Sequence, residues 1–99
     1  MSSDIDLNIF VVHLNSIVRD ERITVWHMAM VFGIMQLATS VDLQAPIYIS
    51  RKKVMRLSHI KNIVTYHKCI KELQQFGYIR YIPSYHPAIG SQVYLLISL

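Results

Sequence analysis

Three basic residues in succession, Arg51, Lys52 and Lys53, follow Ser50 in the middle of the chain. A serine at this place can cap a helix, because its hydroxyl oxygen accepts from the backbone N–H of the first turn. Cations in that turn oppose the helix dipole and cost about a few tenths of a kcal/mol each. A bound phosphate would offset this cost, since the hydroxyl, the free N–H groups and the cations form an anion site. The alternative is a solvated charged face.

A second polar cluster follows about ten residues later and begins with Lys61 and Asn62. Together with Val64, Thr65 and Lys68 it supplies an amide, a hydroxyl, a methyl group and two cations. Such groups read base edges and hold phosphates. The alternative is the polar face that any helix of a water-soluble domain carries.

Charge is divided unevenly between the two halves of the chain. Residues 50–99 carry eight Lys or Arg and only one acid, Glu72, for a net charge of +7. Residues 1–49 carry two basic and five acidic residues, for a net charge of −3. A field concentrated on one half of a small domain attracts polyanions. Nucleic acid is therefore the first partner to consider.

The remaining reactive residues show no pattern of a metal or catalytic centre. The five histidines fall on five different predicted elements and lack the spacing of metal ligands, and Cys69 is the only cysteine. Five of the six acids lie in the first half, away from the polar clusters. No nucleophile–base pair is visible. We expect no metal, no cofactor and no enzymatic activity.

Two helices are predicted in the first half. Apolar residues at helical spacing between positions 7 and 18 predict one helix with a buried stripe, capped by Asp4 or Asp6. The stripe consists of Leu7, Phe10, Val11, Leu14, Ile17 and Val18. A second helix over about 24–40 is apolar around nearly its whole circumference, which is typical of a helix that is central or shared with a partner.

The second half begins with a short strand over 47–49 after a loop over 41–46, and continues with a short helix over 51–57. After a turn over 58–61, a longer helix begins near Asn62 and ends at Gly77, with its apolar stripe at Ile63, Tyr66, Ile70, Leu73 and Phe76. Its opposite face carries Thr65, Lys68, Lys71 and Glu72. Strands over 78–82 and 92–97 then form a β-hairpin.

This order of elements predicts an α+β fold, a winged helix-turn-helix with an extra N-terminal helix and a C-terminal β-hairpin wing. We expect one domain over 1–99, with the first helix and a linker over 1–22 and the winged-helix core over 23–99. The hairpin tip, residues 83–91, contains Pro83 and Pro87 and offers Tyr85 and His86 as contacts. Arg80 is the only cation on the hairpin, so an ordinary loop is the alternative.

Residues 47–95 resemble the small winged-helix proteins encoded on bacterial conjugative transposons and related mobile elements. The segments that carry the resemblance are YISRKKVM (48–55), TYHKCIKEL (65–73) and GYIRYIPSYHP (77–87), with a looser similarity in WHMAMVFGIMQLA (26–38). The resemblance implies a DNA-binding regulator, or an accessory factor of excision and transfer. It marks Thr65, Tyr66 and Lys68 on the recognition helix.

Taken together, these patterns predict a protein that binds double-stranded DNA and reads the major groove with the helix over 62–76. The expected contacts are Ser50, Arg51, Lys52, Lys53, Lys61, Asn62, Thr65, Tyr66, His67, Lys68, Lys71, Arg80, Tyr85 and His86. For His67, packing beside the hairpin is the alternative. Because 53% of the residues are apolar, we also expect a homodimer built on the N-terminal helices.

A second function class remains open: a module that docks through its N-terminal helices on a protein of a recombination or transfer complex. The chain has neither a secretory signal nor an apolar run of the roughly 20 residues that a bilayer crossing needs. We therefore expect a cytoplasmic protein without a membrane partner.

Overall fold

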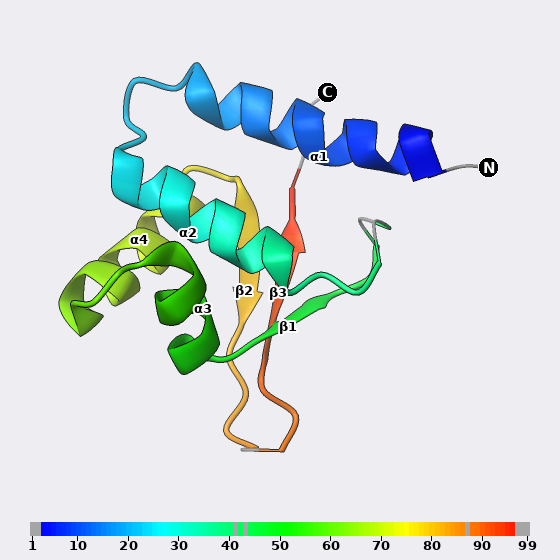
Figure 1. Cartoon of the computed structure of the whole chain (residues 1–99). Coiled ribbons are helices and arrows are strands. Elements are labelled where there is room, and N and C mark those ends of the chain that lie inside the picture. The colour runs from blue at the N-terminus through cyan, green and yellow to red at the C-terminus, as the bar shows by residue number, and fades with distance from the viewer. Residues whose placement is uncertain (1–2, 41, 43, 87, 97–99) are drawn as a thin grey trace.

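The computed structural model describes residues 3–40, 42, 44–86 and 88–96, with side chains from Phe10 onward (Figure 1). It is an α+β fold with four helices and a three-stranded antiparallel sheet. The elements in chain order are α1 (Ser3–Val18), α2 (Val25–Gln36), β1 (Ile47–Ile49), α3 (Arg51–Ser58), α4 (Ile63–Gln75), β2 (Ile79–Ile82) and β3 (Ser91–Leu95).

Helix α1 begins earlier than predicted and buries a different stripe. Asp4 and Asp6 lie inside the helix, so neither is its N-cap. Val11 and Val18 were expected in the core but are 49% and 64% exposed, whereas His13 is completely buried. Nε2 of His13 lies 2.8 Å from the Tyr78 carbonyl oxygen, which gives this polar ring a partner in the interior.

Helix α2 begins at a capping box. The Thr24 hydroxyl accepts from the His27 N–H, and the His27 ring accepts from the Thr24 N–H. The helix ends at Gln36, four residues before the predicted end, and Thr39 and Ser40 beyond it are residue types that favour non-helical conformations. Its apolar circumference is divided, because Met30, Val31 and Ile34 are buried while Val25, Trp26 and Phe32 are at least half exposed.

Helices α3 and α4 are joined by a tight turn, and a side chain caps the start of each; the predicted cap at Ser50 is confirmed. The Ser50 hydroxyl accepts from the Lys53 N–H at 3.2 Å, which caps α3. The Asn62 side-chain oxygen accepts from the N–H groups of Val64 and Thr65, which caps α4. Between them, His59 has a φ of 60°, in the left-handed region that turns the chain sharply.

Helix α4 ends in a Schellman motif, as the glycine at position 77 predicts. Gly77 has a φ of +83°, its N–H bonds to the Gln74 carbonyl, and the Tyr78 N–H bonds to the Leu73 carbonyl. Strand β2 begins directly afterwards at Ile79. The end of α4 therefore fixes where the hairpin starts.

The sheet has the order β1-β3-β2, so the last strand lies between the other two. Ile47 pairs with Val93, and Ile79 with Leu95. These four residues are buried on the face that packs against the helices. The hairpin is confirmed, but β3 begins at Ser91 and ends at Leu95. Predicted strand residue Ile97, loop residue Val41 and tip residue Pro87 lie outside the described residues.

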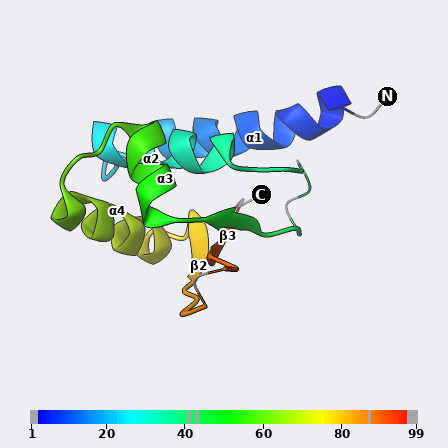
Figure 2. The same cartoon turned by 60° about the horizontal axis from the view of Figure 1, so that its bottom comes forward.

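Figures 1 and 2 show how the elements are arranged. Helix α1 crosses one end of the molecule, and the tip between β2 and β3 projects from the opposite end (Figure 1). The start of α3 lies toward the tip, and α4 lies beside α3 (Figure 2). In the part of the chain that the structure describes, none of the helices has the length and apolar character needed to cross a bilayer.

Candidate nucleic-acid interface

All eight basic residues of the second half are exposed. Among the described residues, the structure contains two close pairs of acidic with basic or histidine side chains, Arg22 with Asp20 and His27 with Glu72, and neither involves any of the eight. They lie on α3, in the turn after it, on α4 and on β2, at positions 51, 52, 53, 56, 61, 68, 71 and 80. Their positive charge is therefore not neutralised by carboxylates of the described chain and is available to an external polyanion.

The single acid of this half is held away from that surface. The Glu72 carboxylate accepts a hydrogen bond from Nε2 of His27 on α2 at 2.9 Å. Glu72 was predicted on the outward face of α4 with Thr65, but it lies at the contact between α2 and α4. Helix packing thus turns the only acid of residues 50–99 toward α2.

The outward face of α4 is rotated from the predicted one. Val64 is 70% exposed, and His67, Lys68 and Lys71 are also exposed. Thr65 is half-buried. The face therefore combines two cations, an imidazole and an apolar side chain along about two turns of helix, and these groups suit phosphates, base edges and a thymine methyl respectively.

Tyr66 was predicted to contact DNA, and this prediction is wrong, because its side chain is buried. It is 3% exposed, and burial raises the pKa of its hydroxyl to about 12. Its ring meets the exposed His67 ring edge-on, with centroids 5.2 Å apart. Tyr66 therefore anchors α4 and supports His67. Ile63, which was predicted in the core, is 42% exposed at the start of the helix.

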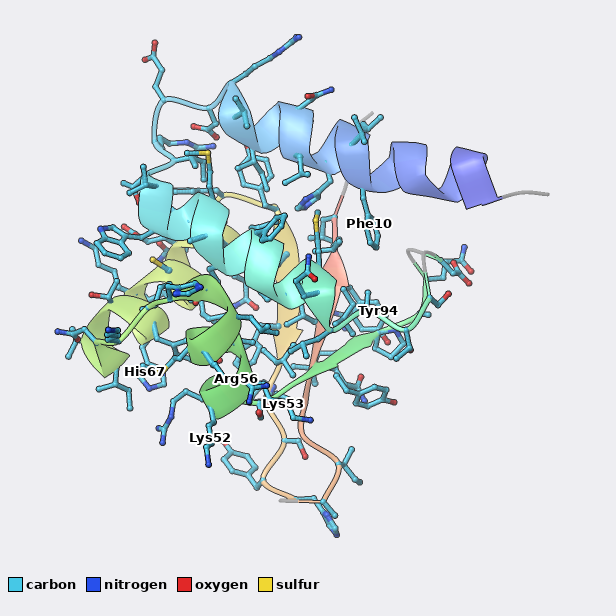
Figure 3. All side chains as sticks on the ribbon, in the orientation of Figure 1. Phe10, Lys52, Lys53, Arg56, His67 and Tyr94 are labelled. Carbon is cyan, nitrogen blue, oxygen red and sulfur yellow. The ribbon has the colours of Figure 1, made fainter. Side chains whose placement is uncertain are left out.

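The start of α3 contributes cations to an open groove beside α4. Arg51, Lys52, Arg56 and Lys61 line this groove together with the apolar Met55, Ile60 and Ile63. Figure 3 shows Lys52 and Lys53 on the side of the molecule where the hairpin tip lies. Because the Ser50 oxygen is occupied by the Lys53 N–H, the hydroxyl hydrogen is the group that remains for a phosphate.

A neighbouring hollow contains a residue that the sequence reading did not assign to the site. Trp26 at the start of α2 is 50% exposed and lines this hollow with the turn before α4. The other lining residues are His59, Ile60, Lys61, Asn62 and Thr65. The Asn62 oxygen caps α4, so its NH₂ group is what remains for an external acceptor. No sequence signal distinguished Trp26 from the buried apolar residues of the same helix.

The hairpin tip presents Tyr85, which is 96% exposed, and the exposed His86. Ser91 is tied inside the hairpin, because its Oγ accepts from the Ser84 N–H at 3.2 Å and lies 3.3 Å from the Tyr81 hydroxyl. Arg80 is exposed on β2. The tip thus contains no Lys, Arg, Asp or Glu and lies beside a positively charged surface.

Within the described residues, no group of three or more His, Cys, Asp or Glu side chains is placed to hold a metal ion. Cys69 is buried, and burial raises the pKa of its thiol. No family model, curated protein or solved structure matches the chain.

Proposed function

We propose that this chain is a winged helix-turn-helix protein that binds double-stranded DNA and inserts α4 into the major groove. The observation that carries the proposal is the set of seven exposed cations on α3, the turn after it and α4, none of which has a carboxylate partner among the described residues. Cations in this arrangement release counterions from a duplex when they meet its phosphates.

The topology supports the proposal independently of the charge. A helix, a short strand, two helices joined by a tight turn and a β-hairpin follow one another, and the first strand pairs with the last. In a helix-turn-helix, the second helix of the pair reads the groove while neighbouring elements hold the backbone. That helix is α4 here, with Val64, His67, Lys68 and Lys71 outward. The tip with Tyr85 is the wing.

The biological role follows from the resemblance to proteins of mobile elements and is part of the proposal. It is regulation of transcription, or an accessory part in excision or transfer, in the cytoplasm. No catalytic step is proposed, because the face outlined above contains groups that bind DNA but no nucleophile–base pair.

Fluorescence anisotropy with a random-sequence duplex of about 20 base pairs tests the proposal. Two to five phosphate contacts predict an affinity that falls about 10- to 500-fold between roughly 50 and 200 mM salt. Polyglutamate is the control competitor, since it carries negative charge without bases or grooves. If no duplex binding occurs at the lower salt, or if polyglutamate competes as well as unlabelled duplex, the proposal is wrong.

A second candidate function rests on the apolar surface of the N-terminal helices. Val25, Trp26 and Phe32 are 66%, 50% and 56% exposed, and α2 contains no Lys, Arg, Asp or Glu. Exposed apolar surface of this kind is typical of a contact with another protein. The contact would be a homodimer, or a docking surface for a protein of a transfer or recombination complex.

Sedimentation equilibrium separates the two candidates. An apolar interface predicts self-association that changes little between about 50 and 200 mM salt, in contrast to the duplex affinity. Phe32→Ser is expected to shift a dimer toward monomer, whereas Arg19→Ser, an exposed position outside this surface, should leave it unchanged. A protein that stays monomeric at high concentration would exclude the homodimer.

A further inference from the structure

The face of the sheet opposite the helices carries a set of side chains that the duplex-binding surface does not use. Side chains alternate along each strand, and the buried ones point to the helical core. We call the remaining set the outer sheet face. It consists of Tyr48, Arg80, Ile82, Gln92 and Tyr94.

The register places these residues in two adjoining rows. Tyr48 is opposite Gln92, which is opposite Ile82 on the other side, and Tyr94 is opposite Arg80. Tyr48 and Tyr94 are therefore diagonal neighbours on adjacent strands, with Cα atoms roughly 7–8 Å apart. In the view of Figure 3, Tyr94 and His67 lie on opposite sides of the hairpin strands.

The outer sheet face is accessible and bears one sign of charge. Tyr48 is 51% exposed, Arg80 is exposed, and Tyr94 is partly exposed. Arg80 is the only charged residue among the five, and no carboxylate belongs to the set. A polyanion is thus the complementary ligand, and Gln92, opposite Tyr48 and two residues before Tyr94 on β3, offers its NH₂ group as a donor.

Two aromatic rings beside an arginine on a sheet suit unpaired bases. Exposed aromatic side chains stack on bases without sequence preference, and a cation holds the backbone. The bases of an intact duplex are stacked on one another and cannot reach the rings in this way. The ligand that fits this surface is therefore single-stranded.

We propose that the outer sheet face is a second nucleic-acid site, which binds unpaired nucleotides of a single strand. Tyr48 and Tyr94 stack on bases, and Arg80 contacts a phosphate. The site goes beyond the duplex-binding function of α4 and does not depend on it. A protein with both surfaces would bind a junction at which a duplex opens into single strands.

Anisotropy of a fluorescein-labelled 12-nucleotide oligothymidine at about 50 mM salt tests the proposal. Tyr48→Ala and Tyr94→Ala should each weaken binding on the order of 5- to 150-fold, the range expected for one stacked base. Tyr48→Phe and Tyr94→Phe keep the ring and should remain within about twofold of wild type. Arg19→Ala changes an exposed side chain outside the surfaces proposed for binding and serves as the control. Far-UV circular dichroism of each variant checks the fold.

The outcomes separate this proposal from the duplex proposal. If both alanine variants bind the oligothymidine with wild-type affinity, the single-strand proposal is wrong. It is also wrong if Lys68→Ala loses as much affinity for the oligothymidine as Tyr48→Ala does, because the oligothymidine would then bind at α4. If Tyr48→Ala fails to fold, Arg80→Gln tests the same face at an exposed position and should weaken binding severalfold. Single-strand binding that needs Tyr48 and Tyr94, without duplex binding by the same protein, would refute the duplex proposal and leave this one standing.

Discussion

Nε2 of His27 on α2 donates a hydrogen bond to the Glu72 carboxylate on α4 across 2.9 Å. The direction follows from the other ring nitrogen, because Nδ1 accepts from the Thr24 N–H at 2.8 Å and therefore carries no proton. The same ring thus caps α2 and joins it to α4. The same contact keeps the only acid of the basic half away from the surface proposed for DNA.

Glu72→Ala should destabilise the protein, because it leaves the N–H of a nearly completely buried imidazole without an acceptor. The expected loss is about 1–3 kcal/mol in the free energy of unfolding, measured by urea denaturation at pH 7.5. Glu72→Gln retains an acceptor oxygen and should lose less than about 1 kcal/mol. Equal losses in the two variants would show that the hydrogen bond is not what Glu72 contributes.

His13 should make the folded state sensitive to mild acid. Burial lowers the pKa of its ring below 6.5, and the bond to the Tyr78 carbonyl only partly opposes this. The unfolded chain then binds the proton more readily, so stability is complete above about pH 6.5 and falls as the pH drops below that value. Urea denaturation at pH 7.5, 6.0 and 5.0 measures the decline.

His13→Gln is the matched variant for this test, since its amide can still donate to the Tyr78 carbonyl but does not titrate in this range. Its stability should decline less between pH 6.5 and 5.0 than that of the wild type. The other four histidines are present in both proteins, so the difference isolates His13. Identical slopes would exclude His13 as the acid-sensitive group.

Tyr78→Phe should raise the pKa of Asp20. The Asp20 carboxylate accepts from the Arg22 guanidinium and from the Tyr78 hydroxyl, the latter at 2.6 Å. These bonds, led by that of Arg22, hold the pKa of Asp20 well below its usual value. Without the hydroxyl, a carbon-detected NMR titration should find a higher pKa that is still below about 4, because Arg22 remains. An unchanged value would show that the tyrosine does not stabilise the charged form.

Much of the fold could be predicted because local signals and packing agree there. Ser50, Asn62 and Gly77 are cap residues, and each ends or begins a helix within one residue of its predicted place. Less could be predicted for α1, where the apolar spacing is compatible with more than one buried stripe. A hydrogen bond to the distant Tyr78 carbonyl places His13 inside, and local periodicity contains no trace of that partner.

In the candidate site, too, some features could be predicted from the sequence and others could not. The exposure of the cations could be predicted, since desolvating an unpaired charge is costly. Which face of α4 points outward could not be predicted, because it depends on contacts with other elements. Glu72 is hydrogen-bonded to His27 on α2, and Tyr66 is buried in the core. Trp26 was missed for a similar reason, since only the tertiary packing determines which side of an apolar helix stays exposed.

Gly90→Ala should destabilise the hairpin more than Gly77→Ala does. Both glycines have a positive φ, +77° and +83°, which costs an alanine about 1–2 kcal/mol. A Cβ at position 90 would also lie 3.0 Å from the Ile49 carbonyl oxygen, whereas one at position 77 would have no neighbour within 4 Å. Urea denaturation compares the two, and equal losses would show that the close approach of Gly90 to β1 is easily relieved.

Lys68→Ala should reduce the dependence of duplex affinity on salt if α4 lies in the groove. Each lost phosphate contact lowers the slope of log K against log salt by about 0.9, and an exposed lysine in the middle of α4 accounts for one.

Arg19→Ala is the matched control, since it removes an exposed cation just after α1, which lies at the opposite end of the molecule from the hairpin tip (Figure 1). It should leave the slope unchanged, because that end does not face the duplex. Asn62→Ala is less suitable, as it also removes the cap of α4 and about 0.5–2 kcal/mol of stability. Equal slopes for Lys68→Ala and the wild type would place the duplex on another surface, and a reduced slope for Arg19→Ala would point to the end formed by α1.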